Sequence, residues 1–230
     1  MTATADAEVW LRCFKPIDTP RLRLVTMPHA GGGPSIFRSW PAALPDDVEM
    51  LAVRYPGRQD RLLEDCIDQM DELADRITEA LTRYSTSPMI LFGHSMGASV
   101  AYEVAVRLEK WHGRPMQALV VSGQAPPHRA SYRDAHLRGD EALLADVRSL
   151  GGADTEALDH PDLRDLILPA LRADYALLAG YSRDPLHVLR SPVTAYVGKY
   201  DEDVPIDEVA RWAEVTRAGF ALRVFTGGTA

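Results

Sequence analysis

The sequence predicts an α/β fold, in which a mostly parallel central sheet is flanked by helices and carries a helical insertion. Short apolar runs recur along the 230 residues, and the run at 117–123 is nearly continuous, as in a strand buried on both faces of a parallel sheet. Amphipathic helical patterns separate several of these runs. A tight glycine turn at 93–97 joins one run to the helical pattern that follows it. Strand, turn and helix in this order are typical of α/β domains.

Length and composition predict one domain over residues 1–230. The chain is 46% hydrophobic, which supplies a substantial core for a domain of this size. Its formal net charge of −8 argues against a general affinity for nucleic acid or for an anionic membrane. Because Cys13 and Cys66 lie far apart and form no C-x-x-C pair, we expect neither a disulfide framework nor a zinc or other metal site.

The pattern of charge and hydropathy predicts a cytoplasmic protein. Residues 1–11 lack the basic stretch and following apolar stretch of a secretory leader, and no run of about 18 apolar residues occurs in the sequence. We therefore expect neither secretion nor a membrane-spanning segment. We also expect a monomer.

Six strands are expected, each a short apolar or alternating run. They are residues 21–27, 48–53, 88–92, 117–123, 192–198 and 220–225. Residues 1–20 are mixed and predict an arm or an edge element. Amphipathic helices are expected from about residue 68 to residue 84, after the turn at 93–97, and over 206–216.

Residues 126–189 differ in character from the rest of the chain. They contain several short helical patterns, broken by glycines and prolines, and no convincing strand. A helical insertion of this length between two core strands predicts a lid over the site. Its apolar underside is expected to come from Leu143, Leu144, Leu166, Ile167, Leu171, Tyr175, Leu177 and Leu178.

The turn Gly93-His94-Ser95-Met96-Gly97 has the G-x-S-x-G pattern of a nucleophile elbow. Such a turn strains the backbone at the serine, and glycines on both sides avoid contacts between Cβ atoms and the neighbouring strand and helix. Ser95 would then stand at the positive end of a helix, where developing negative charge is stabilised. Ser95 is therefore the predicted nucleophile.

The turn His29-Ala30-Gly31-Gly32-Gly33 directly follows the first strand and can direct backbone N–H groups toward one point. A phosphate-binding loop is the alternative, but the Lys-Ser/Thr pair of a P-loop is missing. The turn resembles the H-G-G-type oxyanion loop of α/β-hydrolases. That resemblance implies an oxyanion hole made by the N–H groups of Ala30 and Met96.

An acidic turn, Lys199-Tyr200-Asp201-Glu202-Asp203, closes the strand at 192–198. An aspartate just beyond the carboxyl end of a strand suits the third member of a nucleophile–base–acid relay, because its carboxylate orients and neutralises an imidazolium. Asp201 is the predicted acid of the relay. Asp203 is the alternative, although it could instead cap the helix that begins at Ile206.

Five motifs together resemble the type II thioesterases of polyketide and nonribosomal peptide pathways. In chain order they are Pro28-His29-Ala30-Gly31-Gly32, Tyr55-Pro56-Gly57-Arg58, Gly93-His94-Ser95-Met96-Gly97, Gly198-Lys199-Tyr200-Asp201 and Phe225-Thr226-Gly227-Gly228. The resemblance implies an α/β-hydrolase fold and a Ser-His-Asp acyl-enzyme mechanism. The substrates would be acyl groups on the phosphopantetheine arm of acyl or peptidyl carrier proteins, and the enzyme would need no cofactor of its own.

The sequence departs from this family at the relay's histidine. In the family a histidine follows the final Gly-Gly, where this sequence has Thr229, and none of the seven histidines follows the last expected strand. We expect the natural protein to supply residues that this sequence lacks. Without a general base, Ser95 would lose a contribution of about 10²–10⁴-fold in rate.

Two other functions remain open. A carboxylesterase or lipase would use the same nucleophile on oxygen esters, and a catalytically silent module would only bind carrier proteins. Because carrier proteins are generally acidic, a basic patch at the mouth of the site would favour their binding. The arginines considered for such a patch are Arg54, Arg58, Arg61, Arg129 and Arg133.

Overall fold

The computed structural model describes residues 4–113, 116–132, 134–150, 160–183 and 185–226. Among these residues, seven strands form one sheet in the order β1-β3-β2-β4-β5-β6-β7, in which only β1 runs antiparallel to its neighbour. The strands are β1 (Leu11–Cys13), β2 (Leu22–Met27), β3 (Val48–Val53), β4 (Met89–His94), β5 (Ala118–Ser122), β6 (Val193–Gly198) and β7 (Phe220–Phe225). The six predicted strands are confirmed to within two residues at either end. The edge element expected in the first 20 residues contains β1.

The helices also follow the predicted order. They are α1 (Thr4–Trp10), α2 (Met70–Leu81), α3 (Met96–His112), α4 (Asp140–Ser149), α5 (Pro161–Ala179) and α6 (Ile206–Ala210). Helix α1 was not predicted, because seven residues are too few to show a clear apolar period. Helix α6 is shorter than expected, since residues 211–215 continue it as a 3₁₀ helix.

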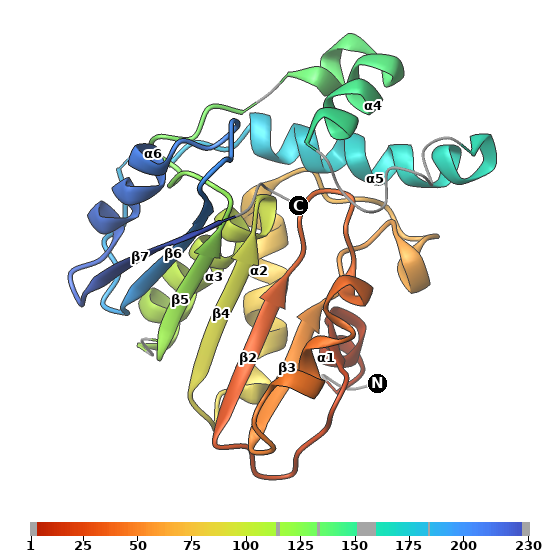
Figure 1. The fold of residues 1–230 in the computed structure, drawn as a ribbon. Helices are drawn as coiled ribbons and strands as arrows, with labels where there is room; N and C mark the ends of the chain where they lie inside the picture. Colours follow the sequence, from red (N-terminus) through yellow and green to blue (C-terminus); the bar gives the residue numbers. More distant parts are fainter. Residues whose placement is uncertain (1–3, 114–115, 133, 151–159, 184, 227–230) are drawn as a thin grey trace.

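Helix α3 is the central helix of the molecule. It packs on β2, β4, β5 and α2 (Figure 1), and its residues from Met96 to Glu109 are buried. Its buried face includes the charged residues Glu103 and Arg107 as well as apolar ones. These two side chains lie one turn apart and form an ion pair, which compensates their charges. The start of this helix, just after β4, places Ser95 at the carboxyl edge of the sheet.

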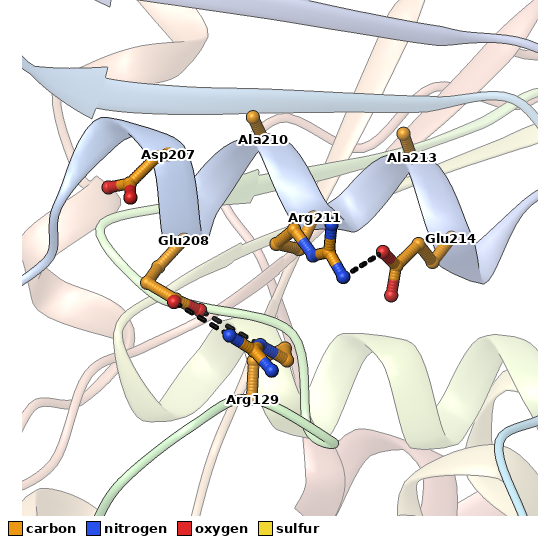
Figure 2. A pocket seen from close by; sticks show the side chains of 7 residues that line it. All are labelled: Arg129, Asp207, Glu208, Ala210, Arg211, Ala213 and Glu214. Atoms are coloured by element: carbon orange, nitrogen blue, oxygen red, sulfur yellow. Dashed lines mark hydrogen bonds and ion pairs between the residues drawn. The ribbon is translucent and has the colours of Figure 1, made fainter.

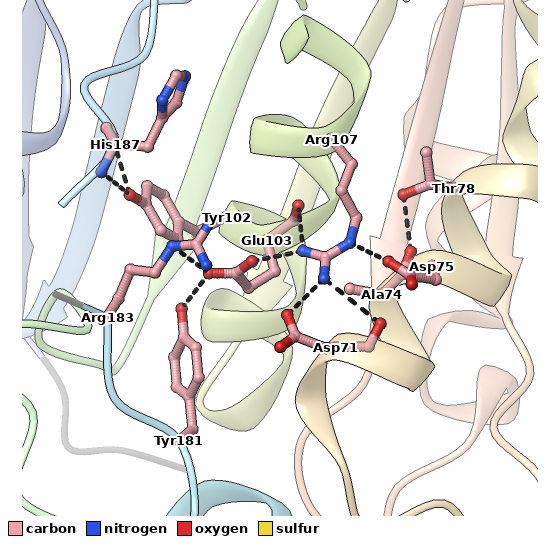
Figure 3. A network of polar contacts seen from close by, with 10 residues as sticks. All are labelled: Asp71, Ala74, Asp75, Thr78, Tyr102, Glu103, Arg107, Tyr181, Arg183 and His187. Carbon is pink, nitrogen blue, oxygen red and sulfur yellow. Dashed lines mark hydrogen bonds and ion pairs between the residues drawn. The ribbon is translucent and has the colours of Figure 1, made fainter. Parts of the chain in front are cut away.

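A polar network fixes α3 to its neighbours (Figure 3). Arg107 donates to Asp75 at 2.5 Å and to Asp71 at 2.6 Å, both on α2. Glu103, which is fully buried, accepts a hydrogen bond of 2.8 Å from the Tyr181 hydroxyl and pairs with Arg183. The network therefore ties α2 and the segment after α5 to the helix that carries the nucleophile.

Helices α4 and α5 lie across the carboxyl edge of the sheet, between β5 and β6 in the chain (Figure 1). Together with the short 3₁₀ helix at 135–138 they enclose a small apolar cluster of their own. Its buried members are Ala135, Leu143, Leu144, Leu168, Leu171 and Tyr175. Of the underside residues expected, Leu177 instead joins the main core and Leu166 is exposed. No helix among the described residues is long and apolar enough to cross a membrane.

Candidate active site

Ser95 occupies the tight turn between β4 and α3. Its φ of +52° and ψ of −122° lie in a region that residues other than glycine rarely adopt. The conformation is held by a hydrogen bond of 2.8 Å from the Ser95 N–H to the carbonyl oxygen of Ser122 on β5, and by one of equal length from the Ala98 N–H to the Ser95 carbonyl oxygen. The strained turn predicted for the nucleophile is therefore present.

The two glycines of the turn are required by close backbone contacts. A Cβ atom on Gly93 would lie 2.0 Å from the carbonyl oxygen of Gly97, and one on Gly97 would lie 2.1 Å from the carbonyl oxygen of Met27. Neither distance is possible for a side-chain carbon. The glycines thus allow α3 to begin directly against β2 and β4.

The glycine loop after β2 lies beside the nucleophile strand. In the parallel pair β2–β4, Met27 is the partner of Gly93, so the loop that begins at Pro28 leaves the sheet next to the turn at Ser95. The Gly32 N–H donates to the His29 carbonyl oxygen at 3.0 Å, and Gly31 has a φ of +75°. This register brings the backbone segments of Ala30 and Met96 to neighbouring strand ends, which is the arrangement that a shared oxyanion hole needs.

Asp201 lies in the turn after β6. One oxygen, Oδ1, accepts from the N–H groups of Asp203 at 3.0 Å and Val204 at 2.9 Å. The other, Oδ2, is buried and has no hydrogen-bond partner among the described residues, and burial raises the pKa of this carboxyl group. An unpaired buried carboxylate oxygen is costly unless a donor meets it, so its presence marks a site for one. The N-cap position of α6 is occupied by Pro205 and not by Asp203, the alternative cap residue.

Two histidines lie close to the nucleophile turn. The rings of His29 and His94 meet edge to face with their centroids 6.1 Å apart, and His94 Nδ1 lies 3.1 Å from the Ser122 hydroxyl. Burial, with a smaller effect of His29, lowers the pKa of His94 to about 4, so this imidazole is neutral at pH 7. Among the described residues, no hydrogen bond joins a histidine to the Ser95 hydroxyl. Thr229, at the family's histidine position, lies outside them.

The arginines expected to form a basic patch are paired with acidic residues. Arg58 and Arg61, with side chains 8% and 5% exposed, bind Asp174 and Glu64. These two arginines are not available to a partner, so the prediction was wrong for them. Arg54 and Arg129 are more exposed, but each is bound to a carboxylate, Asp60 and Glu208 respectively. Arg133 lies outside the described residues.

The surface hollows of the described chain include a charged one and an apolar one. Figure 2 shows one beside α6, where Arg129 binds Glu208 and Arg211 binds Glu214. Four of its five charged groups pair with one another, and none of its lining residues belongs to the five motifs. The other is mainly apolar and includes His94 and Ser122. Its lining residues are Ile36, Phe37, Trp40, Phe92, His94 and Ser122. Because it reaches the residue before Ser95, we place the active site at this edge of the sheet and not beside α6.

Asp174 is a buried residue of the site region that the motifs did not indicate. It lies on α5, one turn after Leu171, and binds both Arg58 and the N–H of Gly31 in the glycine loop. Sequence separation hides this contact, since 143 residues divide Asp174 from Gly31. One signal was present: an acidic residue stands among the apolar residues predicted to form the underside of the insertion.

Comparisons with known proteins agree with this geometry. The family model of the thioesterase domain matches residues 22–230. The chain is 42% identical to thioesterase PikA5 of Streptomyces venezuelae over 224 residues, which are 97% of this chain and 80% of that protein. It is 37% identical to a probable cadicidin biosynthesis thioesterase of Streptomyces griseus, covering 99% of this chain but only 63% of that relative.

Among solved structures, the type II thioesterase BorB from the borrelidin biosynthetic cluster superposes with a TM-score of 0.86. The two chains are 38% identical, and the match covers 96% of this chain and 90% of BorB. The predicted fold class, a mostly parallel sheet of the α/β-hydrolase type, is thereby confirmed.

Proposed function

Because this chain belongs to the thioesterase family, and within it to the type II thioesterases, we propose that it removes acyl groups from the phosphopantetheine arm of carrier proteins. Members of the family are hydrolases that act on thioesters. PikA5 and the cadicidin protein are both named as thioesterases, the latter of a biosynthetic pathway. BorB is a type II thioesterase from the borrelidin biosynthetic cluster. The pathway of this chain would be of the polyketide or nonribosomal peptide kind.

The observation that carries the proposal is the backbone of Ser95. A serine with positive φ, at the first turn of a buried helix and beside the carboxyl ends of parallel strands, presents its hydroxyl for attack on a carbonyl. The positive end of α3 and the N–H of Met96 would stabilise the negative charge that develops there. The N–H of Ala30 would be the second donor.

The reaction we propose has two steps. Ser95 Oγ gives its proton to a general base and attacks the thioester carbonyl carbon, and the tetrahedral intermediate collapses as the carbon–sulfur bond breaks and the thiolate takes up the proton. Water, deprotonated by the same base, then attacks the acyl-enzyme and releases the carboxylic acid and Ser95. No group outside the protein is consumed except water.

Asp201 would orient that base. Its unpaired buried Oδ2 suits an imidazole N–H, and its Oδ1 is already fixed by two backbone N–H groups. The family's position for the histidine falls at Thr229, and His94, with its lowered pKa, is bound to Ser122. We infer that the base of the relay is an imidazole whose N–H meets Asp201 Oδ2.

Matched substrates test the proposal. The gene-length protein and its Ser95→Ala variant are given an acyl-pantetheine thioester and the oxygen ester of the same acyl group. We expect hydrolysis of the thioester to exceed that of the ester and to be lost in the variant. Preference for the ester would identify a carboxylesterase. Tight carrier-protein binding without turnover would identify a binding module.

A further inference from the structure

We propose that Asp174 on α5 is a positioning residue for the oxyanion loop, so that the hole is fully formed only when α5 lies over the sheet as it does here. The proposal rests on the proposed function, because it assigns the loop to the stabilisation of a tetrahedral intermediate. It gives α4 and α5 a part in catalysis beyond covering the site.

The polar contact is direct and buried. Asp174, whose side chain is 2% exposed, accepts a hydrogen bond of 2.7 Å at Oδ2 from the N–H of Gly31. Gly31 is the residue after Ala30, the proposed donor. Since successive peptide units share an α-carbon, fixing the N–H of Gly31 fixes the plane of the peptide that contains the Ala30 carbonyl, and limits rotation of the Ala30 N–H. A charged acceptor makes this bond stronger than a neutral one would.

An apolar contact from the same helix holds the same loop. Leu171 lies one turn before Asp174, and a Cβ atom on Gly31 would come within 2.6 Å of its Cδ2. Ala30 packs against the apolar cluster to which Leu171 belongs. Leu171 of α5 therefore lies close against Gly31, whose positive φ favours glycine, and the cluster that includes Leu171 packs on the preceding Ala30.

Arg58 binds both Asp174 and the same loop. Its Nη1 and Nη2 bind the two oxygens of Asp174 at 2.6 and 2.8 Å, and its Nη1 also lies 3.4 Å from the carbonyl oxygen of Gly32. The guanidinium lies over the ring of Tyr55, whose hydroxyl donates to the Pro28 carbonyl oxygen at 3.3 Å. The loop is thus bound at Pro28, Gly31 and Gly32.

This arrangement couples the position of α5 to the state of the loop. Any displacement of α5 that separates Asp174 from Gly31 leaves the Gly31 N–H without its acceptor and Arg58 without its carboxylate. The loop can then rotate, and the Ala30 N–H loses its fixed direction. The structure consequently links closure of the helical segment to readiness for catalysis.

Two double variants separate positioning from stability. Removing Asp174 alone would strand a buried arginine and could prevent folding. Arg58→Met with Asp174→Leu removes both charges together with the acceptor for Gly31, whereas Arg58→Met with Asp174→Asn removes both charges but retains an acceptor oxygen. Arg172→Gln, which breaks the exposed α5 ion pair with Asp140, is the control.

The readouts are the rate at which a fluorophosphonate labels Ser95 and deuterium exchange in the peptide around residues 28–34. In the Arg58→Met/Asp174→Leu protein (Met/Leu), we expect the labelling rate to fall about 10–100-fold, which is less than the fall caused by removing a whole oxyanion donor. We also expect deuterium exchange around Gly31 to become faster. The Met/Asn protein should stay within about fivefold of wild type, and Arg172→Gln should equal wild type. Equal labelling and equal exchange in the two double variants would overturn the proposal.

The outcomes distinguish the two proposals. If wild type is labelled at Ser95 but cleaves no thioester, the proposed function fails and the labelling ratio still decides the role of Asp174. If wild type is not labelled at all, deuterium exchange alone decides: quicker exchange in the Met/Leu protein than in the Met/Asn protein supports positioning, and no difference refutes it.

Discussion

Gly97 on α3 lies so close to Met27 on β2 that a Cβ atom at Gly97 would come within 2.1 Å of the Met27 carbonyl oxygen. The nucleophile helix therefore begins against the backbone of the strand that leads into the glycine loop. This contact sets the distance between the two segments that would form the oxyanion hole. It also gives the reason for a glycine at the second position of the elbow.

Substitution of Gly97 by alanine tests that contact. The added methyl group must push α3 away from β2, because its neighbour is backbone and cannot rotate aside. Overpacking of this kind costs about 1–3 kcal/mol and at times more, and we expect at least about 3 kcal/mol of unfolding free energy to be lost in urea titrations. Gly180→Ala is the control, since its new Cβ atom would come no closer than 3.4 Å to the Ala176 carbonyl oxygen. Equal stability of the two variants would contradict the account.

His94 should make the protein less stable in mild acid. Its pKa is about 4 in the folded chain and 6.5 when unperturbed, so between these values the unfolded chain binds more protons than the folded one. Unfolding free energy then falls as the pH falls from 6.5 to 4, by up to about 3 kcal/mol from this residue. Urea unfolding at several pH values should show the loss in wild type and a smaller loss in His94→Gln. His160→Gln, at an exposed position, should behave like wild type.

Asp201→Asn should separate stability from activity. Burial raises the folded pKa of Asp201 above 3.8, so the folded chain binds its proton more tightly and stability falls as the pH rises from 3.8 through the folded pKa. The amide carries no charge, and its oxygen can still accept from Asp203 and Val204. At pH 7 we expect the variant to be at least as stable as wild type.

Turnover of the same variant in the gene-length protein should fall about 10²–10⁴-fold, because a neutral amide neither stabilises an imidazolium nor selects its productive tautomer. Thermal unfolding and steady-state hydrolysis measure the two effects. A variant that is both less stable and fully active would remove Asp201 from the relay.

Glu103→Ala should be strongly destabilising. The substitution leaves Arg183 and the Tyr181 hydroxyl without their buried acceptor, and loss of one partner from a buried charge network costs about 3–5 kcal/mol. Glu72→Ala is a matched control. Glu72 and Arg76 lie four residues apart and form an ion pair, as Glu103 and Arg107 do, but on an exposed helix face. That change should cost less than about 1 kcal/mol. Similar unfolding free energies for both variants would contradict this role for the network.

The sequence predicted the parts of the fold that local pattern determines. Continuous apolar runs located six strands, and the glycines around Ser95 located the elbow, because both signals lie within a few residues. Strand β1 has only three residues at the sheet edge, too few to show alternation. The environment of Arg58 was not predictable, since its partner Asp174 lies 116 residues later and only the folded chain brings them together. A loop arginine and a buried one look alike in sequence.

The central claim is that Ser95 forms an acyl-enzyme with a thioester. Its most direct test is intact-protein and peptide mass spectrometry of the gene-length protein after brief incubation with a short acyl-phosphopantetheine thioester. We predict a transient adduct of the acyl mass on the peptide that contains Ser95, absent from Ser95→Ala. Thioester hydrolysis that proceeds without an adduct and equally fast in Ser95→Ala would contradict the account.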